Sequence, residues 1–471
     1  MFKNIYSLTI IVTISTLVLF FFSSLRFHLF GAGVDLGFFD QLLYLQSQGI
    51  EPISTITPGI HLIGDHFALI LYPLVLLYKI SPSVYWLLFI QALAFALSVI
   101  PVYFLAKLKG LPDLTCKTLS ICYILYPAVF NINFYTEFRT EVIAIPFFVW
   151  AVYSLEKNNY KVVSICLFLI LCCKEIMSLS TIAFGFLVLF YKKNYKYFCI
   201  YSSFSVAWFL FANYYIIPNY RGGSAAAGIW YFSSLGNSFS ELLITLLTHP
   251  WIVIQRALLP DRIFYYVLLI LPVILGLSYK KIMFFLPAIP PLILNILSDD
   301  NRVRDLIHHY SLPIIPFIFT WLIYSLSDIQ MRKTRSWISP KILFLWSLIA
   351  FFALAKYGYF QSRYFPLMPY NNSVKDAMAL VDSRGSVITS SYIANHLSHR
   401  SQIYLMQGES MLKRIEDLRP EYILISLKHL DHPITIEQAS FIVSKLKQNN
   451  SYHLEYEDNE KNVFLFLLTK T

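Results

Sequence analysis

Residues 5–22, IYSLTIIVTISTLVLFFF, form an uninterrupted apolar run, and residues 31–50, GAGVDLGFFDQLLYLQSQGI, follow it with two carboxylates, Asp35 and Asp40. A helix needs about 20 apolar residues to cross a bilayer. The run has only Lys3 as a basic flank and no clear small-x-small cleavage site, which favours a retained span over a cleaved signal peptide. The chain therefore places two acids where it first leaves the membrane.

The composition supports the same class. The chain of 471 residues is 57% hydrophobic and only 14% charged, and its mean hydropathy is +0.59. A soluble domain is nearer half apolar and a quarter charged. Apolar stretches close to the length of a membrane-spanning helix recur along the chain. These features predict a multi-pass helical protein of the plasma (inner) membrane.

The basic residues predict how the chain crosses the membrane. About eleven spans are expected, at residues 6–28, 84–106, 114–132, 141–156, 161–174, 176–191, 197–217, 263–278, 282–298, 306–326 and 338–355. The basic clusters then fall on one side, at residues 107–109, 192–193, 280–281 and 332–335. Cytoplasmic loops carry such an excess of Lys and Arg, so the amino terminus is expected in the cytoplasm and the carboxyl terminus outside. Residues 67–80 are short for a span and are expected to lie at the membrane interface.

The same clustering excludes one class of partner. The net charge of +10 is by itself compatible with nucleic-acid binding. The bases, however, lie in short clusters between spans, as in the cytoplasmic loops of membrane proteins. No nucleic-acid partner is therefore expected, and the membrane lipid bilayer is the first partner that the sequence predicts.

The tail of the chain differs from the rest. Residues 1–355, with a first outer loop at 29–66, are expected to form an all-α polytopic membrane domain, and residues 356–471 a small extracytoplasmic α/β domain. Strands are expected at 385–391, 401–406, 421–427 and 462–468, and helices at 392–399, 408–418 and 435–448. The tail has no glycine-rich phosphate loop and no nucleophile elbow, so an accessory role is expected.

The two acids of the first outer loop have different expected places. A helix from Gly37 onward, with Phe38, Phe39 and several leucines, would be amphipathic and lie on the membrane surface. Asp40 would then fall in its first turn, where the helix dipole stabilises a carboxylate. Asp35 would precede the helix, either as a cap or as a base that meets a lipid-borne substrate.

Two short motifs place an acid beside a basic side chain. In IGDHF, Asp65 beside His66 is either a helix cap or an acid–imidazole pair for proton transfer or anion binding. In CCKEI, Lys174 and Glu175 occupy a very short turn between two spans. Lys174 can meet a phosphate there as a point charge.

YTEFRTE, residues 135–141, lies at the outer mouth of two predicted spans. Glu137 and Glu141 are four residues apart and would share one face of a helix. Arg139 can bind a phosphate through its bidentate fork. A plain surface ion pair is the alternative.

SDDNRVRDLIHHY precedes a predicted span and combines acids, arginines and histidines. Arg302 or Arg304 is expected to bind a phosphate or pyrophosphate. His308, His309 and Tyr310 would lie at the outer end of the span. Adjacent histidines are not at metal-ligand spacing on a helix, so no metal site is predicted, although a divalent metal is left open. Ionisable groups of the outer loops together indicate one polar cavity that opens outward.

The motifs VDLGFFDQ, GDHF, TEFRTE, CKE and HHYSLPIIPF together resemble the domain-of-unknown-function 2079 family of predicted membrane proteins, over nearly the whole chain. The order of a first span, an acid, an amphipathic helix and a short outer loop also resembles the GT-C superfamily of membrane glycosyltransferases. This resemblance implies a GT-C-like fold; no cofactor is identified. It further implies inverting transfer of a sugar from a polyprenyl-phosphate donor to a glycan, lipid or protein acceptor on the outer face.

The resemblance also implies roles for individual residues. Asp35 matches the acid that acts as base or positions the acceptor, and Asp40 is the reserve candidate. Leu36 stands where many relatives have a second acid, which argues against a metal-dependent reaction. The other candidates would bind the substrates, the donor phosphate in particular: Asp65, His66, Glu137, Arg139, Glu141, Lys174, Glu175, Arg302, Arg304, His308, His309 and Tyr310.

A transporter or flippase of a lipid or polar solute is the alternative function. Transporters show internal repeats and broken helices near the middle of the membrane. No repeat relates the two halves of this sequence, and its charges cluster near one face, so the enzyme is favoured. An anchor for the tail would not need so many spans.

Overall fold

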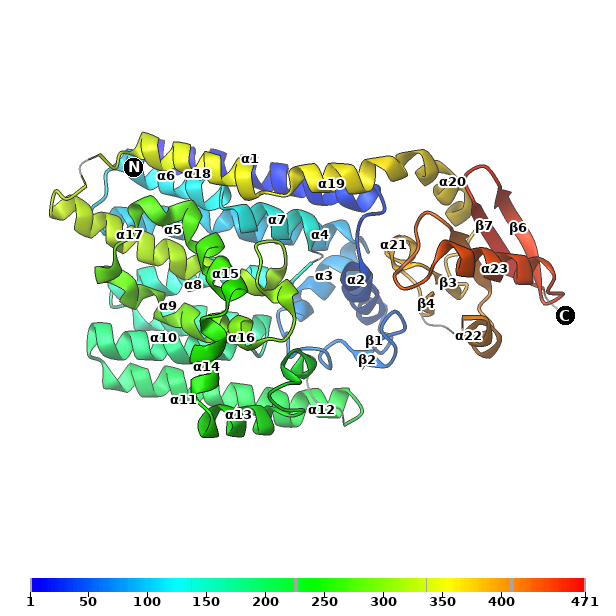
Figure 1. Cartoon of the computed structure of the whole chain (residues 1–471), viewed down its shortest axis with the longest axis horizontal. Helices are drawn as coiled ribbons and strands as arrows, with labels where there is room; N and C mark the ends of the chain where they lie inside the picture. Colours follow the sequence, from blue (N-terminus) through cyan, green and yellow to red (C-terminus); the bar gives the residue numbers. More distant parts are fainter. Residues whose placement is uncertain (1, 137, 224–227, 336, 407–410, 470–471) are drawn as a thin grey trace. The chain divides into compact units, whose positions relative to one another are not determined.

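The computed structural model describes residues 2–136, 138–223, 228–335, 337–406 and 411–469. The chain is mostly helical, with a small β-sheet near its carboxyl end (Figure 1). It divides into two compact units. Unit 1 comprises Met1–Phe21, Ile63–Leu71 and Phe89–Lys356, and unit 2 comprises Phe22–Leu62, Tyr72–Leu88 and Tyr357–Thr471.

Three helices have residues in both units: α1 (Phe2–His28), α3 (Leu71–Ile80) and α4 (Tyr85–Leu97). The remaining long helices of unit 1 are α5 (Val99–Leu108), α6 (Asp113–Ile124), α7 (Pro127–Tyr135), α8 (Thr140–Glu156), α9 (Tyr160–Cys173), α10 (Met177–Lys192), α11 (Tyr195–Phe211), α13 (Phe239–Thr248), α14 (Trp251–Ala257), α15 (Pro260–Ile270), α16 (Ile289–Leu297), α17 (Ile315–Met331) and α18 (Pro340–Leu354). Helices α8, α9, α10 and α11 lie side by side in chain order (Figure 1). Because the turns between them are short, successive helices run in opposite directions.

Helix α17 is the most enclosed helix of unit 1. Its residues from Ile315 to Ile329 are all buried, as expected for a helix that is apolar on every side. Aromatic edges fix it to its neighbours: the ring of Phe317 lies 5.0 Å from that of Phe148 on α8, and the ring of Phe319 lies 5.1 Å from that of Tyr123 on α6. The core of unit 1 is therefore built around α17.

Length and composition single out five described helical segments that could cross a membrane: Tyr6–His28, Tyr85–Leu108, Tyr195–Tyr220, Tyr279–Leu297 and Pro340–Ala379. The pair Trp251–Ala257 and Pro260–Gly276, bent by 70°, would be a sixth. A membrane protein with several apolar helices is thus confirmed, whereas the count of eleven spans is not. Shorter apolar helices such as α9 and α10 fall below the length that a simple span needs.

The span expected at residues 306–326 starts later than predicted. Helix α17 begins at Ile315, and short 3₁₀ turns at Asn301–Val303 and His309–Ser311 precede it. Asp305 explains the difference, because its carboxylate accepts hydrogen bonds of 2.8 Å from the backbone N–H groups of Ile307 and His308. Such side-chain turns compete with helix formation.

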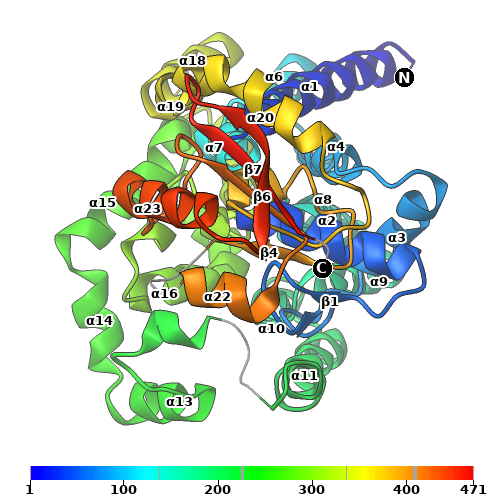
Figure 2. The ribbon, with the colours of Figure 1, turned by 90° about the vertical axis from the view of Figure 1, so that its right-hand side faces the viewer.

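Unit 2 contains a five-stranded sheet in the order β4-β3-β5-β7-β6. Its strands are β3 (Val387–Thr389), β4 (Ile403–Leu405), β5 (Tyr422–Ser426), β6 (Tyr452–Asp458) and β7 (Val463–Leu468). Strand β3 is parallel to β4 and β5, whereas β7 is antiparallel to β5 and β6. Helices α22 (Met411–Leu418) and α23 (Ile436–Lys447) lie against the sheet (Figure 2) and share its apolar core. An α/β arrangement of the tail is confirmed, but strand β6 was not predicted, because its sequence YHLEYED is too polar to stand out.

The first outer loop forms the other part of unit 2, with α2 (Val34–Ser47), β1 (Ile53–Ser54) and β2 (Ile60–His61). Helix α2 begins three residues earlier than predicted, so Asp35 lies in its first turn and Asp40 lies further along. Most of its residues are buried, and α21 (Ser391–Ala394) and β1 pack against it. The expectation of an amphipathic helix on the membrane surface is therefore wrong. A Cβ atom at Gly37 would lie 2.4 Å from Asn395 Oδ1, which shows how closely the two segments approach.

Candidate functional site

Unit 1 gathers ionisable side chains at one end of α8, α9 and α10. We call them the charged cluster; its members are Asp65, His66, Glu141, Lys174, Glu175, Arg221 and His309. Because α8, α9 and α10 alternate in direction, the start of α8, the end of α9 and the start of α10 meet at the same end. The sequence motifs GDHF, TEFRTE and CKE therefore converge through helix packing.

One half of the charged cluster is partly open to solvent. Arg221 Nη1 lies 3.2 Å from Asp65 Oδ1, and Asp65 Oδ2 lies 3.7 Å from His66 Nε2. On its other side, His66 Nδ1 lies 2.8 Å from Glu175 Oε1, while Glu175 Oε2 accepts the backbone N–H of Phe67 at 3.0 Å. One oxygen of Glu175 thus contacts the imidazole, and the other is held by the backbone of Phe67, the residue after His66. The side chains of Arg221, Asp65 and His66 remain 22%, 25% and 21% exposed.

The charges in this half shift the titration of its members. Burial by itself lowers the pKa of His66, but the charges of Glu175 and Asp65 and the hydrogen bond to Glu175 outweigh it, so the pKa is raised. Burial by itself raises the pKa of Asp65 and of Glu175, but in both cases the charges of His66 and Lys174 outweigh it, and both pKa values are lowered. The arrangement therefore favours a carboxylate–imidazolium–carboxylate chain with a cation at its end.

The other half of the charged cluster is buried. Lys174 Nζ lies 2.6 Å from Glu141 Oε1, and His309 Nε2 lies 3.9 Å from the same oxygen. Arg139 lies near enough for its charge to act on Glu141 and His309, and its backbone N–H donates to Gln91 Oε1 at 2.9 Å. This half is connected to the open half through the backbone, because Lys174 and Glu175 are consecutive residues.

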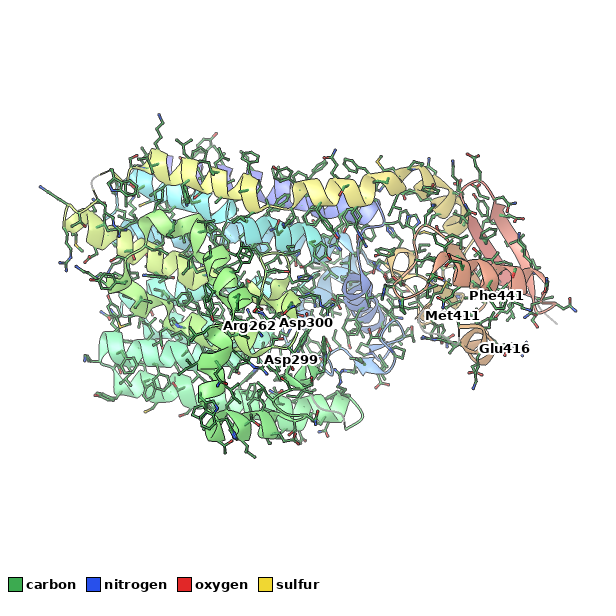
Figure 3. The ribbon with its side chains drawn as sticks, viewed as in Figure 1. Arg262, Asp299, Asp300, Met411, Glu416 and Phe441 are labelled. Atoms are coloured by element: carbon green, nitrogen blue, oxygen red, sulfur yellow. The ribbon has the colours of Figure 1, made fainter. Side chains whose placement is uncertain are left out.

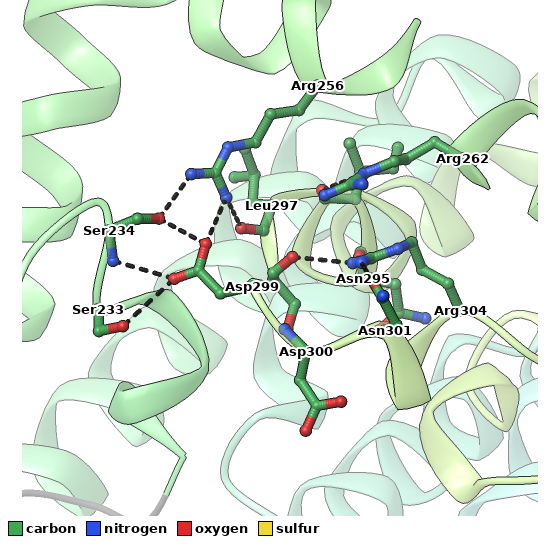
Figure 4. Close-up of polar contacts among 12 residues, drawn as sticks. Ser233, Ser234, Arg256, Arg262, Asn295, Leu297, Asp299, Asp300, Asn301 and Arg304 are labelled. Carbon is green, nitrogen blue, oxygen red and sulfur yellow. Dashed lines mark hydrogen bonds and ion pairs between the residues drawn. The ribbon is translucent and has the colours of Figure 1, made fainter. Parts of the chain in front are cut away.

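The two arginines of the following segment have different surroundings. Arg304 is 2% exposed, and it donates to Asp261 Oδ2 at 3.0 Å and to the carbonyl oxygens of Asn295 and Ser298 at 2.9 and 2.8 Å. These bonds hold the loop in place (Figure 4) and use most of the N–H donors of the Arg304 guanidinium. Arg302 is 63% exposed and pairs with Asp300 at 2.5 Å. Of the two, Arg302 has the guanidinium that a ligand could reach.

The acids of this segment and the neighbouring Arg262 on α15 also have partners. Of the three charges labelled in unit 1 in Figure 3, Arg262 pairs with Asp261 at 2.6 Å, and Asp300 pairs with Arg302. Asp299 accepts the backbone N–H of Ser234 at 2.9 Å and lies 3.2 Å from Arg256 Nη1 (Figure 4). Each of these charges therefore has a partner within the loop structure.

His308, His309 and Tyr310, at the end of the segment, contact different partners. His308 Nδ1 lies 2.7 Å from Asp305 Oδ2, and the hydroxyl of Tyr310 lies 2.5 Å from that of Tyr231. Of these three residues, only His309 reaches the charged cluster, with its Nε2 3.9 Å from Glu141 Oε1. The three consecutive residues thus face different partners.

The two catalytic candidates belong to unit 2. Asp35 is half-buried in the first turn of α2. Asp40 is buried; it accepts a hydrogen bond of 2.5 Å from the Tyr78 hydroxyl and one from the Ser398 hydroxyl, and its Oδ2 lies 3.1 Å from His399 Nε2. The substrate-binding candidates of the described part of the chain all belong to unit 1, and Glu137 lies outside the described residues.

Two local predictions can be judged from the element bounds. Asp65 is not a helix cap, because α3 begins only at Leu71, and its ion pairs are those expected of the alternative. Helix α8 begins at Thr140, so Glu141 is in its first turn, and Arg139 precedes the helix in an extended conformation. Among the described residues, no group of three His, Cys, Asp or Glu side chains is arranged to hold a metal ion.

Sequence reasoning overlooked Arg221, Tyr78, Ser398 and His399. Arg221 lies in NYRGG within a long predicted outer loop, and nothing in one sequence joins it to Asp65. Ser398 and His399 belong to a tail that was given only an accessory role. The sequence gave little indication of their role, because a serine and a histidine beside a short helix are common in any α/β domain.

Residues 26–463 match the family model described as predicted membrane protein (DUF2079). The chain belongs to this family of predicted membrane proteins. No curated protein matches the sequence.

The chain is also similar to several solved structures. It resembles ArnT from Cupriavidus metallidurans bound to undecaprenyl phosphate, with 10% identity, a TM-score of 0.49 and coverage of 97% of each chain. It resembles the Archaeoglobus fulgidus oligosaccharyltransferase tethered to an acceptor peptide, with 11% identity, a TM-score of 0.43 and coverage of 100% of this chain and 74% of that one. AglB from the same organism, in complex with an inhibitory peptide and a dolichol-phosphate, is similar at 11% identity and a TM-score of 0.41, over 91% of this chain and 70% of that one.

Proposed function

We propose that this protein is an integral membrane glycosyltransferase that moves a sugar from a polyprenyl-phosphate donor to an acceptor on the outer face of the membrane. The observation that carries the proposal is the charged cluster at the end of apolar helices in a membrane protein. Ionisable side chains near membrane-spanning segments are energetically costly, so their presence there indicates a function. Lipid-linked sugars carry an anionic phosphate on a membrane-bound tail, which suits cations at the end of apolar helices.

The open half of the charged cluster is the proposed phosphate site. Arg221 and His66 are its partly exposed cationic side chains, and an arginine fork is suited to phosphate oxygens. The neighbouring acids hold both cations in place until the phosphate arrives. Positive charge at this point would stabilise the phosphate as it leaves the sugar. The buried pair of Lys174 and Glu141 supports the site, and Arg139 and Arg302 are further candidates for the donor.

Asp35 is the proposed base. It is half-buried at the start of α2, where a carboxylate can accept the proton of an acceptor hydroxyl. In-line attack at the sugar carbon would invert its configuration. The amino terminus is proposed to lie in the cytoplasm and the carboxyl-terminal residues 356–471 outside, because the basic clusters mark the cytoplasmic side.

Lipid binding tests the phosphate site. The full-length protein would be placed in nanodiscs and titrated with undecaprenyl phosphate, and the bound lipid measured by native mass spectrometry. Arg221→Gln and His66→Gln should each weaken binding about tenfold, the worth of one charge-assisted hydrogen bond. Lys117→Gln, which removes a cation from α6 outside the cluster, is the matched control. Equal binding by all four proteins would refute the phosphate site.

Sugar transfer tests the base separately. Mass spectrometry of lipids that copurify with the protein identifies the glycosylated donor for an assay. Asp35→Asn should abolish transfer while undecaprenyl phosphate binding stays unchanged, because the carboxylate acts on the acceptor and not on the phosphate. Unchanged transfer by Asp35→Asn would remove Asp35 from the catalytic role.

One observation favours a transporter or flippase as a second candidate. Trp251–Ala257 and Pro260–Gly276 form a pair bent by 70°, and discontinuous helices are common in transporters. A fluorescent polyprenyl phosphate in liposomes would distinguish the two. Movement of the probe between leaflets without any sugar transfer would favour the transporter.

A further inference from the structure

Asp40 lies at the meeting point of three side chains of unit 2. We call Asp40, Tyr78, Ser398 and His399 the Asp40 clamp. Tyr78 on α3 and Ser398 donate from their hydroxyls, and His399 Nε2 lies 3.2 Å from Oδ1 and 3.1 Å from Oδ2. Each oxygen of the carboxylate therefore has a hydroxyl donor and the imidazole beside it.

The clamp is one part of a wider attachment of α2 to residues 395–401. Asn395 Nδ2 donates to the carbonyl oxygen of Ala32 at 2.8 Å, just before the helix starts. Gln41, next to Asp40, donates to the carbonyl oxygen of Arg400 at 3.2 Å and to Thr55 Oγ1 at 2.8 Å. These bonds hold α2 on both sides of Asp35, so the position of that carboxylate depends on them.

A buried carboxylate is an expensive way to attach a helix. An apolar side chain of similar volume would often serve stability as well or better. The side chain of Asp40 is 2% exposed, whereas that of His399 is 35% exposed and stacks on Tyr44 at 4.9 Å between ring centres. His399 can therefore exchange a proton with water, and Asp40 cannot contact a substrate without leaving its partners.

We propose that Asp40 is a positioning residue, and that Ser398 and His399 hold it so that α2 presents Asp35 in a fixed orientation. This gives residues 356–471 a defined part in the site. The proposal rests on the proposed function for the role of Asp35, but the attachment itself can be measured without sugar transfer.

The clamp should respond to pH in one direction. Burial by itself lowers the pKa of His399, but the hydrogen bond to Asp40 and its charge outweigh it, so the pKa is raised. The groups that face the ring are Asp40 and Tyr44 from α2 and Tyr78 from α3. A histidine with a raised folded pKa stabilises the fold below its unfolded pKa, and this contribution is lost as the pH rises through the folded pKa.

Hydrogen–deuterium exchange of the full-length protein in nanodiscs tests the proposal. Protection factors of the amides of residues 34–47 would be compared at about pH 6 and about pH 8.5, either side of the ordinary range of histidine. Asp40→Asn should lower protection about tenfold, as expected when buried donors lose a charged acceptor. In the wild type, protection should fall at the higher pH, and His399→Gln should abolish that difference.

A matched control is available in the same unit. His453 on β6 lies 3.2 Å from Glu455 in an exposed pair, so His453→Gln should leave the exchange of residues 34–47 and its pH difference unchanged. Exchange of residues 34–47 that is the same in Asp40→Asn, His399→Gln and the wild type would overturn the proposal. A uniform loss of protection over the whole of unit 2 would also overturn it, since it would show a merely structural role.

Two further measurements separate this proposal from the proposed function. Asp40→Asn and His399→Gln should lower the rate of sugar transfer with little change in undecaprenyl phosphate binding, and the loss in His399→Gln should be greater at low pH. If the exchange results hold but no variant or wild-type protein binds the lipid, the proposed function fails and the clamp stands. If lipid binds and exchange is unaffected, the clamp fails and the proposed function stands.

Discussion

The charged cluster of unit 1 and the Asp40 clamp of unit 2 both bury carboxylates, but they compensate the negative charge in different ways. Glu141 faces the ammonium group of Lys174 at 2.6 Å. Asp40 instead has two hydroxyl donors and one imidazole. An ion pair can exchange one partner for the charge of a ligand, whereas a carboxylate enclosed by several donors is held in place. The comparison suggests binding in the first region and positioning in the second.

The largest expected effect comes from breaking the buried ion pair. Lys174→Met should lower the free energy of unfolding by about 3–5 kcal/mol, because it leaves Glu141 as an unpaired buried charge. Thermal unfolding in detergent would measure it. The matched control is Lys117→Met, which breaks the more exposed pair with Asp113 at 2.8 Å and should change stability by at most about 1 kcal/mol. Similar small losses in both variants would show that the pair is well solvated.

The Asp40 clamp should give a smaller effect. Asp40→Asn should lower the free energy of unfolding by about 1–3 kcal/mol, since an amide cannot accept from all three buried donors. A double-mutant cycle with His399→Gln measures the coupling between them. The double variant should be little less stable than Asp40→Asn alone. Fully additive losses would show that the two side chains act independently.

The pH dependence of stability should reflect both regions. The raised pKa values of His66 and His399 stabilise the fold below about pH 6.5, the ordinary value, and this stability is lost as the pH rises through the folded values. The lowered pKa values of Asp65 and Glu175 act at the acid end: their contribution is present above the ordinary carboxyl range and is lost as the pH falls through the folded values. The contribution of His66 and His399 to stability should therefore decline from about pH 6 to about pH 8.5. Below about pH 6.5 His61, His396 and His429, whose pKa values burial lowers, change stability in the opposite direction, so the contribution of His66 and His399 is measured as the difference in melting temperature between the wild type and variants.

Variants of His66 and His399 measure how much each histidine contributes to this decline. His66→Gln and His399→Gln should each remove part of this declining contribution, and the double variant should remove more of it. The exposed pair of His453 and Glu455 again supplies the control. A profile in the double variant that is as steep as in the wild type would assign the decline to other groups.

The smallest expected effect is that of one hydroxyl. Tyr78→Phe should lower the free energy of unfolding by about 1 kcal/mol, because Asp40 keeps Ser398 and His399 as partners. Chemical or thermal unfolding at a pH near 6.5 would measure it. A loss as large as that of Asp40→Asn would mean that Tyr78 alone holds the carboxylate.

The sequence predicted the elements that depend on local patterns. Apolar runs gave helices close to their observed bounds in α8, α9 and α10, since such stretches have few alternatives in a membrane. Short apolar runs alternating with helices gave most of the strands of the tail, whereas β6 escaped because this edge strand carries many polar residues. The helix expected at residue 306 was displaced by the side-chain turns of Asp305.

Most members of the charged cluster were named from the sequence, but their pairing was not. The motifs named these residues: Asp65, His66, Glu141, Lys174, Glu175 and His309. In the structure they form two groups of contacts, which the consecutive residues Lys174 and Glu175 bring next to each other. Lys174 and Glu175 are consecutive residues, yet they bond to different partners, Glu141 and His66. Adjacent residues at a helix junction point in different directions, so sequence neighbours need not be partners.

The sequence by itself determined that this protein is a multi-pass helical membrane protein of the DUF2079 family with an α/β tail, because hydrophobic periodicity and motif order are local properties. Only the tertiary structure decided that Arg221 pairs with Asp65, and that Ser398 and His399 hold Asp40. These contacts join residues far apart in the chain. Their geometry follows from how helices and strands pack, and no pattern along one sequence records which distant side chains will meet.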